Sequence, residues 1–329
     1  MPSPTAAITE ESASHFAIVA EAYGGPDVLS VVEAEVPSPG PGEVTIEVRA
    51  AGVNPIDRKL YSGAFGRSAE NLPLRLGLEV AGVITEVGPG AVGPAGPLSV
   101  GDEVIAYPTE GGYATAITVS ANGVVPKPAE LSWEQASGLL LVGATAVHAV
   151  TVVEVGAGDT VLVHGGSGAV GLLAVQLSLA QGATVVATAG ERNQTLLRDV
   201  GAVPLTYGPS LLDRVRRAAP SGITAVIDAV GTDEAIDVSL DVAPERSRIV
   251  SIAAFHRGDT GIKLIGHGPG GDPGTGIRSN AWRRLLPLVA TGKLIPLAVK
   301  TYPFTDAAQA HALLGQGHPD GKLVLIPAR

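Results

Sequence analysis

The sequence predicts an α/β fold in which a Rossmann-type, doubly wound parallel sheet follows a β-rich region. Residues 16–130 consist of short runs rich in β-branched residues, separated by glycine and proline turns. After Gly158 and Asp159 the pattern changes to apolar strands that alternate with helical segments. A glycine-rich turn joins the first of these strands to a helix. These observations together predict two domains of different architecture.

The β-rich region predicts an antiparallel domain with no long helix before Trp133. Its β-rich runs occupy residues 16–23, 28–36, 43–53, 77–90, 101–108 and 113–120. Ser132 and Gln135 then form a capping-box pattern before the apolar stretch that starts at Ala136. This pattern predicts the first substantial helix and the hinge between the domains.

The alternating region predicts a strand at residues 160–165, a helix at 169–182 and further strands at 184–190, 204–207, 224–231 and 248–254. Beyond it lie a glycine-rich loop at 266–276, helices at 282–289 and 306–314, and a closing strand at 322–326. The loop composition is consistent either with a lid over a substrate or with a surface linker.

Composition excludes several classes of function. The 22 basic and 32 acidic residues give a net charge of −10, which argues against a nucleic-acid partner. The absence of cysteine excludes disulfides, thiolate metal ligands and a thiol nucleophile. The apolar stretch at 138–153 is too short to span a bilayer, and residues 1–15 read as a mobile tail, not a signal peptide. We therefore expect a cytoplasmic protein that contacts neither nucleic acid nor membrane.

The glycine-rich turn predicts a dinucleotide site. A G-x-G-x-x-G motif between a strand and a helix comprises Gly166, Ser167, Gly168, Ala169, Val170 and Gly171. We expect Gly166 to form the tight turn, Gly168 to let the backbone approach a pyrophosphate, and Gly171 to permit close packing of helix on strand. The alternatives are a turn without ligand and a hydrolase nucleophile elbow, which would require glycine at Ala169.

The end of the second strand indicates the type of nicotinamide cofactor. No acid occupies this strand end near Thr188, where NAD-binding proteins carry one for the ribose hydroxyls. Gly190, Arg192 and Asn193 follow, and they suit a 2′-phosphate, with Tyr207 flanking the adenine. NADPH is therefore favoured over NADH. Glu191 argues against this preference, and Arg192 is also consistent with a solvated surface charge.

An ordered set of motifs now points to a family. VNPIDRK, GLEVAG, GDEVIAYP, GGYA, GATA and VLVHGGSGAVG follow one another between residues 53 and 171. In this order they resemble the medium-chain dehydrogenase/reductase superfamily, and within it the zinc-free NADPH:quinone oxidoreductases of the zeta-crystallin type. The resemblance implies a Rossmann NADP-binding domain at 139–268, inserted into a GroES-like catalytic domain at 16–138 and 269–329.

The resemblance also implies chemistry without zinc. Zinc-dependent relatives use a cysteine near the VNP segment and a histidine in a GHE motif, and Leu78 stands in place of that histidine, beside Glu79. We expect His164 to be a packed core residue and not a metal ligand. Without a metal, the expected reaction is direct hydride transfer to a quinone or to an α,β-unsaturated carbonyl compound.

By resemblance, the catalytic candidates lie in and beside the VNP segment. Asn54 would hydrogen-bond near the reacting centre, and Lys59 would face the nicotinamide ribose or the substrate. Zeta-crystallin has tyrosine where Lys59 stands, whereas some enoyl reductases have lysine. A C=C reductase is therefore the second hypothesis for the activity. Tyr61 is the next candidate. The alternatives are a surface lysine in a polar turn and a packing aromatic.

The family places further residues beside the cofactor. They are Thr145 in GATA, Val230 at the end of the fourth strand, and Ile252, Ala253 and Phe255 at the end of the fifth. Ordinary strand packing is the alternative for these residues. Relatives also pair sheet edges into homodimers, and residues 261–266 are a candidate edge. A noncatalytic NADPH-binding member, structural or associated with RNA, is the alternative from another class.

Overall fold

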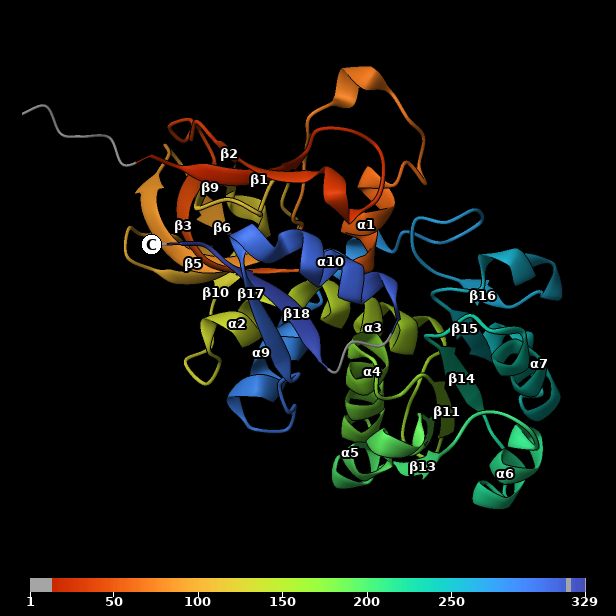
Figure 1. Ribbon diagram of the computed structural model, residues 1–329. Coiled ribbons are helices and arrows are strands. Elements are labelled where there is room, and N and C mark those ends of the chain that lie inside the picture. Colours follow the sequence, from red (N-terminus) through yellow and green to blue (C-terminus); the bar gives the residue numbers. More distant parts are fainter. Residues whose placement is uncertain (1–13, 318–320, 329) are drawn as a thin grey trace, which may run out of the picture.

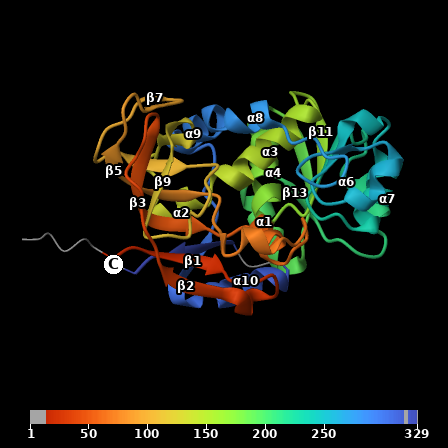
Figure 2. The same ribbon diagram turned by 90° about the horizontal axis from the view of Figure 1, so that it is seen from above.

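Two large sheets organise the chain in the computed structural model, which describes residues 14–317 and 321–328 (Figure 1). Figure 2 shows the β-rich part at one end of the molecule and the helices that cover the second sheet at the other. The predicted tail at residues 1–15 lies outside the described residues except for its last two.

The first large sheet has seven strands and combines strands from the N-terminal part of the chain with its last two strands. Six of its strands follow the order β10-β8-β5-β3-β18-β17, and β9 also pairs with β3. The strands are β3 (Glu43–Gly52), β5 (Val80–Val87), β8 (Glu103–Ala106), β9 (Ala116–Ser120), β10 (Val124–Pro126), β17 (Val299–Pro303) and β18 (Lys322–Ile326). β18 pairs with β3 in antiparallel orientation, so the last segment of the chain returns to the sheet of the N-terminal region.

Smaller elements surround this sheet. They are the three-stranded sheet of β1 (Phe16–Ala20), β2 (Leu29–Glu33) and β4 (Leu74–Arg75), the hairpin of β6 (Val92–Gly93) and β7 (Gly96–Pro97), and the helices α1 (Pro55–Tyr61) and α10 (Ala307–Gly315). A single apolar core joins α10 to the sheet through Ala307 and Ala310.

The second large sheet is parallel and has six strands in the order β13-β12-β11-β14-β15-β16. The strands are β11 (Thr160–His164), β12 (Thr184–Thr188), β13 (Val203–Leu205), β14 (Ala225–Asp228), β15 (Ile249–Ser251) and β16 (Lys263–Leu264). Numbered along the chain, this order is the 3-2-1-4-5-6 of the doubly wound fold. The predicted fold class is therefore confirmed.

Helices cover both faces of the parallel sheet. They are α3 (Leu140–Val152), α4 (Ala169–Ala180), α5 (Gln194–Asp199), α6 (Leu211–Ala218) and α7 (Asp233–Val242). Val161 and Val163 of β11 pack with α3 and α4, whereas Leu162 packs with α6 and α7. Side chains alternate along a strand, so an apolar strand buried on both faces supplies two cores at once.

The link between the two regions differs in detail from the sequence prediction. Ser132 and Gln135 form the expected capping box, with both hydrogen bonds present. The helix that it starts, α2 (Trp133–Ser137), stops at Gly138, and α3 begins at Leu140. A Cβ at Gly138 would lie 2.6 Å from the Lys322 side chain, so the break gives that lysine room.

The chain leaves the parallel sheet through short elements. They are α8 (Thr275–Ser279) and α9 (Trp282–Ala290), and short 3-10 turns occur at Glu191–Asn193 and Phe255–Thr260, among others. No helix in the described residues is long and apolar enough to cross a membrane.

Candidate active site

A cavity of about 530 Å³ opens at the carboxyl ends of β11, β12 and β14, and we call it the strand-end cavity. It lies where the strand order reverses between β11 and β14, the place where doubly wound sheets bind nucleotides. Its walls include seven of the predicted cofactor residues, namely Ser167, Gly168, Gly190, Arg192, Asn193, Tyr207 and Val230. Its other lining residues are His164, Gly165, Thr188, Ala189, Leu211, Ala229, Thr232, Glu234 and Ala235.

The glycine turn differs by one residue from the expected geometry. The left-handed backbone belongs to Gly165, with a φ of 73°, and not to Gly166. Gly166 instead packs on the second strand, since a Cβ there would lie 2.8 Å from the Ala187 methyl. At Gly171 a Cβ would lie 2.1 Å from the Gly165 carbonyl oxygen, so only glycine lets α4 pack this close.

The turn after β12 and the glycine turn, which both line the strand-end cavity, are joined to each other. Asn193 Nδ2 donates to Ser167 Oγ at 3.2 Å, which ties the turn after β12 to the glycine turn. Gly190 lies beside the Tyr207 hydroxyl, at 3.5 Å from an ideal Cβ. The N-cap of α4, Gly168, lines the same cavity, and the N-terminus of a helix favours anions.

His164 leaves a polar atom without a partner at the wall of the strand-end cavity. The side chain is 1% exposed, and its Nδ1 lies 3.5 Å from the Thr188 hydroxyl. Its Nε2 is buried and has no hydrogen-bond partner among the described residues. Burial lowers the pKa of His164 to about 4, so the ring is neutral at pH 7. A buried polar atom needs a partner, and a bound nucleotide can supply one here.

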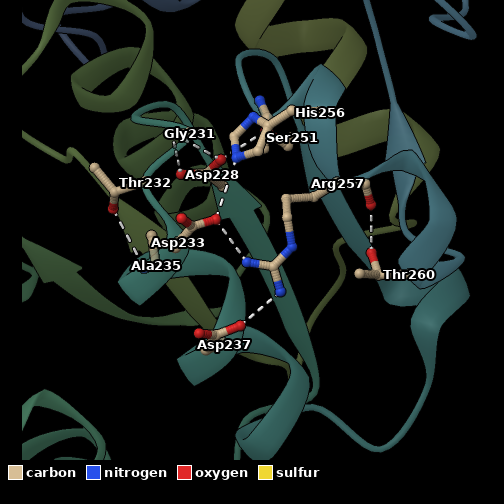
Figure 3. Close-up of polar contacts among 11 residues, drawn as sticks. Asp228, Gly231, Thr232, Asp233, Ala235, Asp237, Ser251, His256, Arg257 and Thr260 are labelled. Carbon is tan, nitrogen blue, oxygen red and sulfur yellow. Dashed lines mark hydrogen bonds and ion pairs between the residues drawn. The ribbon is translucent and has the colours of Figure 1, made fainter.

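A carboxylate that the sequence analysis missed holds together the loops after β14 and β15. Asp228, at the end of β14, accepts hydrogen bonds from the backbone of Val230 and Gly231 at 3.0 Å and from Ser251 Oγ at 2.6 Å (Figure 3). Ser251 Oγ in turn accepts from the amide of Ala254 at 2.8 Å. The loops after β14 and β15 are therefore held in one rigid arrangement.

The segment after β15 is also held from outside. Arg257 donates to Asp233 at 2.8 Å and to Asp237 at 2.6 Å, both on α7 (Figure 3). His256 lies 3.2 Å from the same Asp233 carboxylate. These contacts position the 3-10 turn that begins with Phe255.

A further cavity of about 380 Å³, here called the inter-sheet cavity, lies between the two sheet regions. It brings together six predicted residues, namely Asn54, Lys59, Thr145, Val170, Ile252 and Phe255. Its other lining residues are Pro55, Ile56, Ala64, Phe65, Leu78, Tyr107, Leu141, Val142, Ile265, Gly266, His267, Gly268, Pro269 and Arg278. The glycine-rich loop thus forms part of its wall. Since Val170 lines this cavity and Ser167 the other, the start of α4 lies between the two.

Several predicted site residues do not line either cavity. They are Tyr61, Gly166, Ala169, Gly171 and Ala253. Tyr61 is fully buried, and its hydroxyl lies 3.2 Å from Nδ1 of His311 on α10. The structure therefore gives Tyr61 a place in the core behind α1, and we withdraw it from the catalytic candidates.

Asn54 is held by groups from distant parts of the chain. Its amide donates to the Gly52 carbonyl at 3.2 Å and to Glu79 Oε1 at 3.0 Å, while its oxygen accepts from Lys322 Nζ at 2.5 Å. Lys322 and Glu79 form an ion pair of 2.9 Å, and both are buried. The side chain of Asn54, the N-cap of α1, is thus tied to β3, Glu79 and Lys322.

Comparisons with known proteins agree with this geometry. Residues 40–129 match the model of the alcohol dehydrogenase GroES-like domain, and residues 205–325 match that of the zinc-binding dehydrogenases. A quinone oxidoreductase of Salmonella typhimurium is 32% identical, over 93% of this chain and 97% of its own. The chain belongs to the quinone oxidoreductase family of the medium-chain dehydrogenases/reductases. It is an oxidoreductase.

Solved structures also resemble this chain over nearly its whole length. A mycobacterial protein in complex with NADPH is 32% identical, with a TM-score of 0.81 over 95% of this chain and 100% of that one. An enoyl reductase, CurK, is 26% identical, with a TM-score of 0.83 over 95% of this chain and 99% of that one.

Proposed function

We propose that this family member is an NADPH-dependent oxidoreductase that reduces a quinone or another conjugated carbonyl compound in the inter-sheet cavity. The observation that carries the proposal is the meeting of two cavities at the start of α4, one suited to a dinucleotide and one largely apolar. NADPH supplies a hydride when it is bound. The mycobacterial relative in complex with NADPH and the Salmonella quinone oxidoreductase support both parts.

The strand-end cavity favours NADPH over NADH. Its wall includes Arg192, Asn193 and Tyr207. Glu191, the carboxylate that would argue for NADH, is not among the lining residues. A guanidinium and an amide suit the 2′-phosphate that distinguishes the two cofactors. We assign the unpartnered Nε2 of His164 to the nucleotide as well.

Residues of the inter-sheet cavity orient the acceptor and exclude water. Its apolar wall, with Phe65, Ile252 and Phe255, suits a planar conjugated ring. Lys59, in the last turn of α1, supplies a positive charge to the wall that Asn54 also lines. We propose no role for zinc, because Leu78 lies in the wall and the sequence contains no cysteine.

A C=C reductase is the second candidate function. Lys59 lines the inter-sheet cavity, where it is available to stabilise the charge of an enolate or to supply a proton. The likeness to the CurK enoyl reductase favours the same reading.

The deciding experiment follows NADPH oxidation at 340 nm with 1,4-naphthoquinone and 3-penten-2-one offered separately, NADH as the control cofactor and a chelator present. We expect turnover with the quinone and a preference for NADPH. Turnover with the enone alone would move the protein to the C=C reductases. Tight NADPH binding without oxidation by either acceptor would favour the noncatalytic reading.

We also propose a cytoplasmic homodimer that pairs the outer edge of β16 with that of a second copy. β16 is the outermost strand of the parallel sheet, which supports this assignment of the predicted edge at residues 261–266.

A further inference from the structure

The charged residues that line the inter-sheet cavity all have basic side chains. They are Lys59 and Arg278; His267 also lines the cavity, and neither aspartate nor glutamate is among the lining residues. The chain as a whole is acidic, with a net charge of −10. The charge of this wall is therefore opposite in sign to the net charge of the protein.

Arg278 is held in place by a buried histidine. Its Nε donates to Nδ1 of His148 at 3.3 Å, and the opposite ring nitrogen of His148 lies 3.2 Å from Asp272 Oδ2. His148 is fully buried on α3, and burial lowers its pKa. A neutral ring that accepts at Nδ1 must carry its proton on Nε2, so it donates to Asp272. Carboxylate and imidazole together orient the guanidinium.

The loop backbone is shaped to hold the same histidine. The other carboxylate oxygen of Asp272 accepts from the amide of Gly274 at 2.8 Å. Gly274 has a φ of 59°, and an ideal Cβ there would lie 2.1 Å from the His148 ring. The glycine-rich loop is thereby clamped to α3 at the base of Arg278, and it is a fixed wall on this side of the cavity.

The terminal amino groups of Arg278 have capacity left for a ligand. Among the described residues no carboxylate forms an ion pair with Arg278. Tyr107 is its neighbour in the wall, and that hydroxyl is a weak, uncharged partner. The Asp272 carboxylate acts on the guanidinium only across the His148 ring. A guanidinium that is oriented without a direct carboxylate partner can bind a carboxylate ligand through paired hydrogen bonds.

We propose that Arg278 is the anion-binding residue of the inter-sheet cavity, so that the preferred acceptors are conjugated carbonyl compounds that also carry an anionic oxyacid group. The inference rests on the proposed function for the identity of the reaction. Binding of the anion does not depend on turnover, so the two are tested separately.

The binding test uses the protein saturated with NADP⁺ and two ligands of similar shape, 2-naphthoate and its neutral counterpart 2-acetonaphthone. Calorimetry gives the dissociation constant of each. We expect Arg278→Met to weaken naphthoate binding at least about tenfold and to change acetonaphthone binding less than about twofold. Arg278→Lys keeps the charge without the fork and is expected to fall between wild type and Arg278→Met.

Arg283→Met is the matched control, because Arg283 stacks on Trp282 and does not line the cavity. Equal losses for both ligands in Arg278→Met would show a merely structural role and overturn the proposal. Equal affinity of wild type for both ligands would overturn it as well.

The turnover test separates the two proposals. We measure kcat/KM for 1,4-naphthoquinone and 1,4-naphthoquinone-2-sulfonate, and take the ratio of variant to wild type for each, so that intrinsic reactivity cancels. A selective loss for the sulfonate supports the inference, whereas an equal ratio for both quinones refutes it and leaves the proposed function standing. If neither quinone oxidises NADPH while naphthoate binding still depends on Arg278, the anion site stands and the proposed reaction fails.

Discussion

Residues at the turn after β12 test the cofactor assignment. Replacing Arg192 with alanine removes the guanidinium from the strand-end cavity. A charge-assisted contact contributes about 1.5–3 kcal/mol, so we expect the KM for NADPH to rise by at least about tenfold while that for NADH changes little. Initial rates with each cofactor measure this. The control is Arg198→Ala on α5, outside the cavity, and an unchanged NADPH/NADH ratio in Arg192→Ala would remove Arg192 from the phosphate site.

The buried pair of Lys322 and Glu79 predicts a specific pattern of stability. Lys322→Met leaves the Glu79 carboxylate buried without its cation, a change that costs about 3–5 kcal/mol. Removing both charges in Lys322→Met with Glu79→Gln is expected to cost less than the single change, because no unpaired charge remains. Urea unfolding of the two variants measures both free energies. A double variant at least as unstable as Lys322→Met alone would contradict this account.

Side-chain direction explains why the structure separates two of the predicted catalytic candidates. Lys59 and Tyr61 are two positions apart on α1, and residues at that spacing point to different sides of a helix. Lys59 therefore lines the cavity while Tyr61 enters the core. The sequence analysis predicted no long helix before Trp133 and so had no basis for separating the two. Arg278 was missed because the residues around it carry no motif.

At the scale of elements, strands with strong apolar patterns were predicted and a weak one was not. β11 and β12 are buried almost throughout, so their sequences are continuous apolar runs. β17 is exposed at most positions and contains Lys300 and Pro303, so nothing in its sequence distinguishes it from a loop. It forms because β18 offers it a partner in the sheet. Tertiary context thus decides what local propensity leaves open.

The contact between α1 and α10 contains a buried polar cluster with opposing titrations. Tyr113 donates to Asp57 at 3.0 Å, and its hydroxyl lies 3.2 Å from His311 Nε2. Burial raises the pKa of Asp57 to about 6 and lowers that of His311 to about 4. As the pH falls, Asp57 is protonated at a higher pH in the folded state than in the unfolded state. His311 is protonated at a higher pH in the unfolded state than in the folded state. As the pH falls, the two groups therefore act on stability in opposite directions.

Together with His164, these groups predict a net loss of stability in acid. His164 and His311 each bind protons more weakly in the folded state, so the free energy of unfolding falls as the pH drops from about 6.5 toward about 4. Asp57 offsets part of this between about pH 6 and pH 4. Urea unfolding as a function of pH measures the slope. His311→Gln should flatten it and Asp57→Asn should steepen it, and a change in the reverse direction for either variant would refute the assignment.

At the scale of the whole molecule, the site depends on contacts between segments that are far apart in the sequence. β18 pairs with β3 through Val324 and Gly52, and this pairing brings Lys322 to Asn54. No local pattern encodes a contact across that separation. The family resemblance predicted the return of the chain, but the buried ion pair that accompanies it became visible only in the structure. The residue limits of the two domains stay predictions.

The exposed edge of the parallel sheet determines how two copies can meet. β16 ends the strand order on one side and β13 on the other. Leu264 and Gly266 already form backbone hydrogen bonds with Asp272, so the backbone before Leu264 is the part of this edge that can pair with its symmetry mate in a closed dimer. We expect light scattering to give twice the mass of one 33.1 kDa chain. We also expect amide hydrogen exchange at residues 261–266 to speed up on dilution while residues 203–205 stay unchanged. A mass of one chain would refute the dimer, and faster exchange confined to residues 203–205 would place the interface at the opposite edge.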